Sequence, residues 1–214
     1  MASLCLHNGT VLTGFAAMEH CAVLVEGGVI SDVFSQSASG RTLVNMMKLN
    51  LLIGSGGVLS HAPKRAQAML MMIDAFQPEG ITGLAVDSIF MMPHLGVLAE
   101  VHPKAATEVF ENDCLVPLGT CVAPVGKVKP GQKLMDYELQ FSGGQINRGE
   151  LRQGDLCIFP VNPGQEAMLH CQPVRGLDLG EGAGKSITAA ITHGVVGLVL
   201  DGRGRPLEKY KDEG

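Results

Sequence analysis

The sequence predicts a mixed α/β protein in two parts, an α/β part over residues 1–115 and a small β-barrel or β-sandwich over residues 116–214. Two observations predict this division. Up to about residue 115, short apolar runs alternate with amphipathic stretches, which is typical of strands that alternate with helices. Beyond it, glycine or proline interrupts the chain every few residues, and β-branched or alternating runs lie between these breaks, as in compact β domains.

The first part contains a strand, a turn and a helix in immediate succession. "LNLLIGSGG", residues 49–57, predicts a buried strand that ends in a glycine-rich turn. A helix follows over residues 62–76, where Pro63 suits the first turn. Because proline cannot continue a helix interior, Pro103 separates two further helices. The remaining elements predicted here are a strand at 80–88 and helices at 91–101 and 103–113.

The second part reads as a series of short strands. Two stretches with similar glycine spacing, "GKVKPGQKL" at 126–134 and "GELRQGDLC" at 149–157, each resemble a type I or II turn between strands. Such turns commonly build a small barrel or sandwich. The predicted strands lie at 134–141, 155–161, 166–174, 186–191 and 194–200.

The glycine turn formed by Gly54, Ser55, Gly56 and Gly57 is the strongest candidate for a binding site. A strand, a glycine turn and a helix start put a surface without side chains at the carboxyl end of a sheet, where ligands of open α/β folds bind. A nucleotide or another anion fits this chemistry. The alternative is structural, since glycines also let a strand and a helix pack closely, and the pattern is neither G-x-G-x-x-G nor a P-loop.

The residues around this turn carry a family resemblance. "GRTLVNMMKLNLLIGSGGVLSHAPKRAQAMLMMIDAFQPEGITGLAVDSIFMMPHLGVLAEVHPKAA" closely resembles the C-terminal part of the glutamate mutase accessory family called MutL or GlmL, and "GVVGLVLDGRGRPL" at 194–207 is similar to the end of its longer members. That family is similar to the actin, Hsp70 and sugar kinase ATPases. The resemblance therefore implies that residues 1–115 are part of an actin-like ATPase lobe.

The resemblance also implies a function and a set of site residues. It implies nucleotide-dependent handling of an adenosylcobalamin-dependent mutase, with ATP or ADP at the adenosine-type turn of residues 54–57 and Asp87 at the end of the following strand. Family members open with a lobe that carries an Asp-Gly-Ser/Thr phosphate loop, and residues 1–40 supply none. We therefore expect a fragment or one part of a split protein, with Mg²⁺ held by a missing lobe and nucleotide bound weakly or only with that lobe.

Two other features near candidate sites have alternative readings. His61, just after the turn, could contact a phosphate or base, although a histidine at a helix start more often bonds to backbone or solvent. Gly184, Lys185 and Ser186 suggest a P-loop, but Leu179 stands where the first glycine belongs. We interpret this stretch as a flexible connection between strands that offers an anion only Lys185 and exposed N–H groups.

Composition limits the partners. A formal charge of −5, from 16 basic and 21 acidic residues, and the lack of any Lys or Arg run argue against nucleic acid. No apolar run approaches the ~20 residues that span a bilayer, which argues against a membrane. Without a signal-like start, the six cysteines indicate reduced thiols of a cytoplasmic protein, and they form no metal-ligand spacing.

Partner surfaces are the remaining question. The expected partners are the mutase or an N-terminal ATPase lobe, with homo-oligomers if a surface for that lobe is exposed. The alternative to the accessory function is an interaction module whose β domain docks a partner and whose glycine turn is structural.

Arg203 and Arg205 are predicted to lie in a solvated tail. Five methionines fill core gaps or line an adaptable surface: Met69, Met71, Met72, Met91 and Met92.

Overall fold

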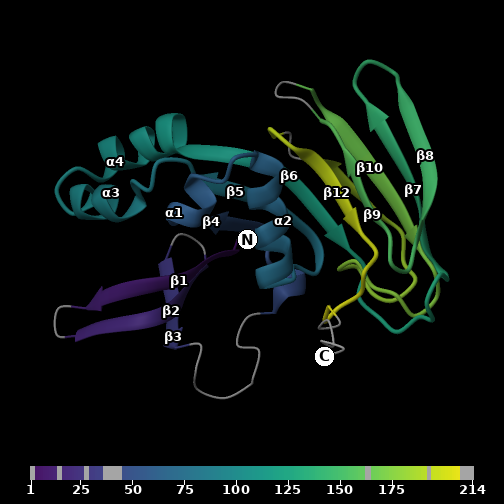
Figure 1. The fold of residues 1–214 in the computed structure, drawn as a ribbon, viewed down its shortest axis with the longest axis horizontal. Coiled ribbons are helices and arrows are strands. Elements are labelled where there is room, and N and C mark those ends of the chain that lie inside the picture. The colour runs from purple at the N-terminus through teal and green to yellow at the C-terminus, as the bar shows by residue number, and fades with distance from the viewer. Residues whose placement is uncertain are drawn as a thin grey trace.

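The structure is a computed structural model that describes the backbone of residues 3–13, 16–26 and 29–35, and both backbone and side chains of residues 45–161, 165–191 and 194–207. Two β-sheets and a few short helices form this part of the chain, which confirms the predicted mixed α/β class. Figure 1 shows the smaller sheet at one end of the molecule and helices α3 and α4 at the other.

The larger sheet has eight strands in the order β3-β2-β1-β4-β5-β6-β12-β9. β1, β4 and β5 run parallel to one another, whereas β6 pairs antiparallel with β5. β12 is parallel to β6, and β9 is antiparallel to β12 at the edge. The bounds are β1 Ser3–Thr13, β2 Ala16–Glu26, β3 Val29–Ser35, β4 Leu51–Gly54, β5 Gly80–Asp87, β6 Leu115–Ala123, β9 Leu156–Phe159 and β12 Gly197–Asp201.

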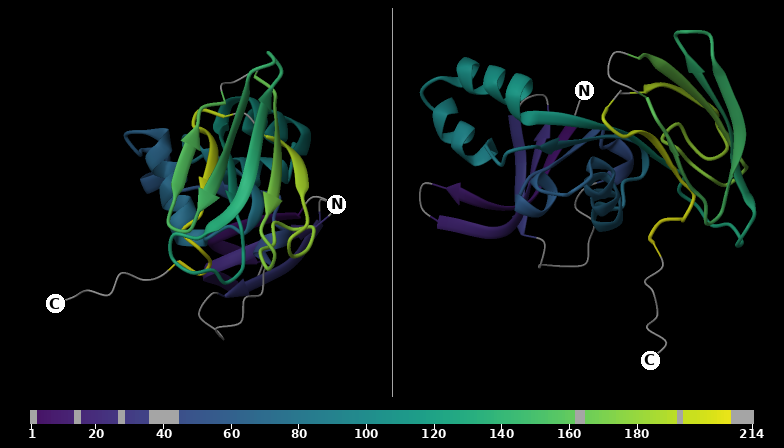
Figure 2. Two further views of the ribbon diagram at one scale, coloured as in Figure 1. Left: turned by 90° about the vertical axis from the view of Figure 1, so that its right-hand side faces the viewer. Right: turned by 45° about the horizontal axis from the view of Figure 1, so that its top comes forward.

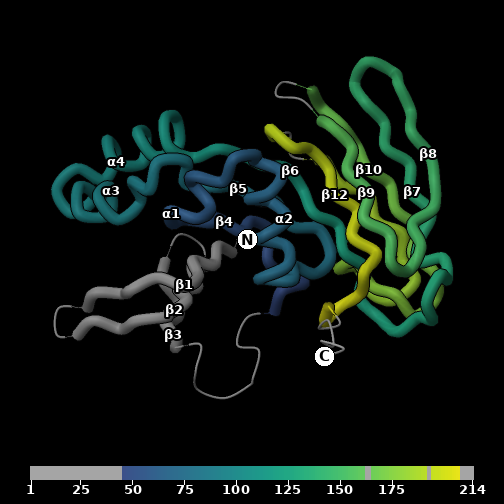
Figure 3. The backbone as a smooth tube through the Cα atoms, in the orientation of Figure 1, coloured from purple at the N-terminus to yellow at the C-terminus, as the bar shows by residue number. Residues whose placement is uncertain are grey.

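The larger sheet contains strands from both sides of residue 115. The chain leaves it after β6 for β7 and β8, returns in the edge strand β9, leaves again for β10 and β11, and returns in β12 beside β6 (Figure 3). Gly197 in β12 pairs with Gly119 in β6. β6 was not predicted as a strand, and its pairing with β5 and β12 is made by residues far apart in the sequence. The division into domains at residue 115 and the actin-like relationship of the first part stay predictions.

The helices follow the sequence prediction closely. The helix expected at 62–76 forms as α2, and the break expected at Pro103 occurs, because Pro103 is the first residue of α4. The helix expected at 103–113 ends early and continues as one π-helical turn, η2. The bounds are η1 Met46–Lys48, α1 Gly57–Ser60, α2 Arg65–Phe76, α3 Met92–Ala99, α4 Pro103–Val109 and η2 Phe110–Cys114.

The smaller sheet has four antiparallel strands in the order β11-β10-β7-β8. Within the described residues it is an open sheet and does not close into a barrel. The prediction of a turn over 149–157 is wrong in part, because the chain stays in β8 as far as Arg152 and turns only at residues 153–154. The bounds are β7 Lys133–Phe141, β8 Ile146–Arg152, β10 Ala167–Pro173 and β11 Ile187–Ile191.

β6 and β12 separate two hydrophobic cores, and alternate residues along them point to opposite sides. Val122 and Leu198 pack into the core shared with the smaller sheet, whereas Cys121 and Val199 pack into the core beneath α2. The two views of Figure 2 show the smaller sheet stacked on one end of the larger sheet. Strands covered on both faces need apolar residues throughout, which explains the continuous apolar run of "GVVGLVL".

The five methionines differ in burial. Met69 and Met72 are fully buried in the core beneath α2, so for them the core interpretation is confirmed. Met91 is partly buried in a separate small core formed by α3, α4 and η2, and Met92 is half-buried as well. Met71 is exposed on α2.

Candidate functional site

The glycine turn lies at the carboxyl end of β4, next to the carboxyl end of β5. The two strands are parallel, and Gly54 pairs with Val86. The next residue on each strand is therefore Ser55 on one side and Asp87 on the other. This register brings together two of the residues that the sequence predicts as a site, although 32 positions separate them in the chain.

The three glycines of the turn meet different surroundings. A Cβ on Gly54 would lie 2.6 Å from Leu59 Cδ1 and 2.8 Å from Met72 Sδ, so at this position glycine lets β4 pack against the following helices. Gly56 has a φ of +121°, which L side chains rarely adopt. A Cβ on Gly56 or Gly57 would have no atom within 4 Å. The structural interpretation therefore holds for Gly54, and the other two glycines present an open backbone surface.

Asp87 is a buried junction between the glycine turn and α3. It is 0% exposed. Its Oδ2 accepts hydrogen bonds from Ser55 Oγ at 3.0 Å and from the Met92 N–H at 2.9 Å, and its Oδ1 accepts from the Met91 N–H at 3.1 Å. Both carboxylate oxygens are thus engaged by the chain itself, in the manner of a residue that caps the start of a helix.

Ser60 ties α1 to the same junction through the backbone. Its hydroxyl donates to the Asp87 carbonyl oxygen at 2.7 Å. The Ser60 carbonyl in turn accepts from Arg65 Nη1 at 3.1 Å. Two hydrogen bonds to Asp87 therefore hold the turn: Ser55 donates to the Asp87 carboxylate, and Ser60 donates to the Asp87 backbone carbonyl.

His61 lies at the end of α1 and is exposed. Its Nδ1 is 3.0 Å from the Gly57 carbonyl oxygen. The ring thus bonds to the backbone of its own helical turn, which is the ordinary role considered for it. This contact also keeps the imidazole close to the open surface of Gly57.

The turn presents a glycine backbone, the Ser55 hydroxyl and the exposed ring of His61. The described residues contain no group of three or more His, Cys, Asp or Glu side chains able to hold a metal ion. In the same part of the chain, no helix is long and apolar enough to cross a bilayer. An open glycine backbone beside a serine hydroxyl and a histidine suits a flat or anionic ligand that approaches closely.

The P-loop-like stretch has a different local structure. It connects β10 to β11, and β11 begins directly after Ser186, so no helix follows. Asp178 Oδ1 accepts hydrogen bonds from the N–H groups of Gly180 at 2.7 Å and Gly182 at 2.9 Å. The stretch is therefore a connection between strands, as expected, and Asp178 takes two of the N–H groups that could have met an anion.

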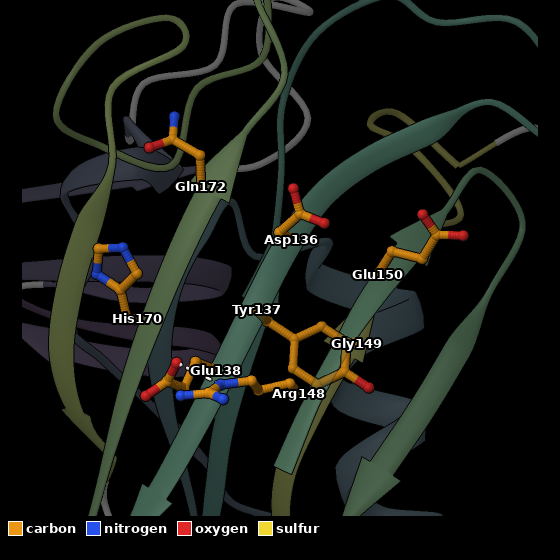
Figure 4. Close-up of a pocket in the computed structure, with 8 residues that line it drawn as sticks. All are labelled: Asp136, Tyr137, Glu138, Arg148, Gly149, Glu150, His170 and Gln172. Carbon is orange, nitrogen blue, oxygen red and sulfur yellow. Dashed lines mark hydrogen bonds and ion pairs between the residues drawn. The ribbon is translucent and has the colours of Figure 1, made fainter. Parts of the chain in front are cut away.

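A second candidate site that sequence reasoning missed lies on the outer face of the smaller sheet. A pocket of about 470 Å³ is lined there by Asp136, Tyr137, Glu138, Arg148, Gly149, Glu150, His170 and Gln172 (Figure 4). Cross-strand register aligns Arg148, Glu138, His170 and Thr188 in one row over all four strands. Only the pairing of distant segments creates this row, so no local sequence signal could have indicated it.

The row is connected by hydrogen bonds. Arg148 Nε donates to Glu138 Oε2 at 2.7 Å, and His170 Nδ1 lies 2.8 Å from Thr188 Oγ1. The hydrogen bond from Arg148 holds the pKa of Glu138 below its ordinary value, and the charge of His170 acts in the same direction. Both ends of the row are exposed, so the row gives the sheet a polar face directed to solvent.

The C-terminal arginines are structural. Arg205 is 1% exposed and Arg203 27% exposed, measured on their side chains, and both bond to the buried carboxylate of Asp201. Arg203 also reaches Asp74 on α2 at 2.8 Å. The prediction of a solvated tail is therefore wrong for residues 203–207, because these contacts fasten the segment after β12 to the end of α2.

One comparison with known proteins gives a match. The family model described as MutL protein matches residues 15–114 of the 214, a region that contains the glycine turn, Asp87 and the α3–α4 pair. Searches of curated proteins and of solved structures found no match. The matched region includes most of the stretch that carried the sequence resemblance. Residues 15–114 of this chain are therefore similar to the MutL protein family.

Proposed function

We propose that this chain is part of an accessory protein for an adenosylcobalamin-dependent mutase, and that its glycine turn contributes to a binding surface for an adenine nucleotide. The family match supports the accessory role. The observation that carries the nucleotide proposal is the open backbone of Gly56 and Gly57, where no atom lies within 4 Å of a Cβ position. This surface lies at the carboxyl ends of the parallel strands β4 and β5, where ligands of α/β sheets commonly bind.

The proposed role is binding without hydrolysis by this chain alone. ATP hydrolysis requires carboxylates that hold Mg²⁺ and orient water. Asp87 is the last residue of β5, and both of its carboxylate oxygens accept hydrogen bonds from the chain itself. We therefore assign the hydrolytic groups to a second lobe, and we expect ATP or ADP to bind weakly in its absence.

The partners that we propose are that second lobe and the mutase. Exposed apolar side chains beside the turn support a contact surface, since soluble proteins rarely leave such groups clustered in water. Val58 in α1 is 75% exposed, and Ile89 and Phe90 directly after β5 are 58% and 45% exposed. In the absence of its partner, we expect the chain to self-associate as its concentration rises.

Isothermal titration with ADP and ATP tests the nucleotide site. Gly57→Val places a branched side chain on the open surface without a left-handed backbone, and Gly56→Val adds backbone strain to the same obstruction. Gly144→Val is the matched control, because Gly144 also has a positive φ and open space but lies in the turn between β7 and β8. Binding in the wild type and the control, and its loss in both turn variants, is the expected result. Heats near zero for every protein would exclude the site.

A second candidate function is an interaction module built on the smaller sheet. The polar row of Arg148, Glu138, His170 and Thr188 favours it, because this row crosses an uncovered sheet face beside a pocket. We propose a protein partner for this face. Co-purification with glutamate mutase tests it: Arg148→Glu should abolish capture if this face docks the mutase. Retention of capture by Arg148→Glu would assign the contact to another surface.

A further inference from the structure

We propose that Ser55 and Asp87 are positioning residues that couple the glycine turn to the pair of helices α3 and α4. This inference rests on the proposed nucleotide site, but it concerns what ligand binding does to the rest of the molecule. The coupling passes through one side chain, the buried carboxylate of Asp87.

The Asp87 carboxylate has one contact on the ligand side and two on the helix side. Ser55, in the turn, donates its hydroxyl to Oδ2. The N–H groups of Met91 and Met92, at the start of α3, donate to Oδ1 and Oδ2. Ser55 and Met92 therefore share one oxygen, so a change in the Ser55 hydrogen bond acts directly on the acceptor that holds the first turn of α3.

The helix pair is built as a unit that can respond to such a change. Leu95 of α3, Ala106 of α4 and Cys114 of η2 form a small buried core that is separate from the core beneath α2. The helix pair connects to the end of β5 through the Asp87 carboxylate and through a backbone hydrogen bond from Ser88 to the Cys114 carbonyl at 2.8 Å. Figure 1 shows α3 and α4 side by side, away from the smaller sheet.

The turn that joins β5 to α3 departs from ordinary backbone conformations. Phe90 has a φ of +57°, in the left-handed region that favours glycine, and its side chain is 45% exposed. The two N–H groups that follow it are the ones that Asp87 accepts. The carboxylate therefore holds this turn in an uncommon conformation, and through it the orientation of α3.

A ligand on Gly56 and Gly57 lies next to Ser55 in the chain, so its binding changes the surroundings of the Ser55 hydroxyl. Coupling between two sites is reciprocal, since each changes the affinity of the other by the same factor. A change that fixes the orientation of α3 will therefore alter nucleotide affinity by the same factor.

Hydrogen exchange with and without saturating ADP tests the coupling. In the wild type, ADP should slow exchange of the Met91, Met92 and Leu95 amides several-fold. At an ADP concentration that titration calorimetry shows to saturate each protein, Ser55→Ala should lose this protection. Ser60→Ala is the matched control, because it removes a hydroxyl bonded to the Asp87 backbone and leaves the carboxylate contacts intact.

A second measurement needs no nucleotide. In the free proteins, Ser55→Ala should raise exchange of the Met91 and Met92 amides about fivefold relative to Ser60→Ala, the factor that a typical buried hydrogen bond accounts for. Equal exchange in these two variants would overturn the coupling whether or not ADP binds. ADP binding to the wild type with no change at α3 would also overturn it. Absence of ADP binding, with the fivefold difference present, would instead remove the proposed function and keep the coupling.

Discussion

Arg205 and Asp201 form an ion pair that is almost completely removed from solvent, with Nη2 and Oδ2 2.9 Å apart. Arg203 bonds to the same carboxylate, and Arg205 Nε donates to the carbonyl of Pro78. The pair lies where β12 ends, next to the segment that connects α2 to β5. It therefore fastens the last described residues of the chain to the part that carries the glycine turn.

Removal of one partner of this pair should be strongly destabilising. Asp201→Ala leaves the buried Arg205 without its counter-charge, and the free energy of unfolding should fall by about 3–5 kcal/mol. Urea denaturation monitored by circular dichroism measures this loss. Lys104→Ala is the control, because Lys104 pairs with Glu108 on the exposed face of α4 and its removal should change the midpoint little. A similar small change for Asp201→Ala would contradict the buried role.

The same carboxylate predicts a pH dependence. Burial raises the pKa of Asp201, but the hydrogen bond from Arg203 and the charge of Arg205 outweigh it, and the net pKa lies below the ordinary value. The unfolded chain then binds a proton more readily than the folded one, so stability is full above the unfolded pKa of about 3.9 and falls as pH drops through the folded pKa. Thermal melts from pH 6 to pH 2.5 should show a smaller acid loss in Asp201→Asn than in the wild type.

The sequence predicted the local parts of this protein well. An apolar run followed by glycines identifies the β4 turn, and Pro103 identifies the start of α4, because both signals lie within a few residues of the structure that they describe. β8 was missed because "INRGELR" has a single buried residue, Leu151, and so lacks an alternating apolar pattern. β6 belongs to the larger sheet through pairings that only the folded chain reveals.

The sequence predicted which residues lie at the ends of the two strands but not the contacts that they make. The strand ends predicted from the sequence locate Ser55 and Asp87. The hydrogen bond between them depends on the parallel register of β4 and β5, which the sequence does not show. The burial of Arg205 depends on Pro78, which is 127 positions away. Local patterns carry no information on such distances, and so the tail was predicted to be solvated.

The cysteines should differ in reactivity. Burial raises the pKa of Cys121 to about 12, and the nearby Asp201 carboxylate adds to the effect; burial alone raises the pKa of Cys171 to about 12. Cys157 is only half-buried, although burial also raises its pKa. Since the thiolate is the nucleophile, iodoacetamide at pH 8 should label Cys157 before the other two, which should react only on unfolding. Peptide mass spectrometry over time measures the order, and equal native rates would contradict it.

Alanine substitutions should separate the packing role of Gly54 from the open surface of Gly57. A Cβ on Gly54 meets the ends of the Leu59 and Met72 side chains, which can shift, so Gly54→Ala should lower the free energy of unfolding by about 1 kcal/mol. Gly57→Ala meets no atom and begins a helix, so its stability should be unchanged or slightly higher.

Gly119→Ala should cause the largest loss of stability of the three alanine variants. A Cβ on Gly119 would collide with the backbone of Gly197, and Gly119 itself has a φ of +142°. Chemical denaturation should therefore rank the variants with Gly119→Ala least stable, Gly54→Ala next and Gly57→Ala equal to the wild type. Because neither backbone geometry nor packing requires glycine at position 57, a loss of nucleotide binding in a fully stable Gly57→Val protein reports on the ligand surface alone. A Gly57→Ala protein as unstable as Gly54→Ala would show that the surface is covered, and the nucleotide site would lose its main support.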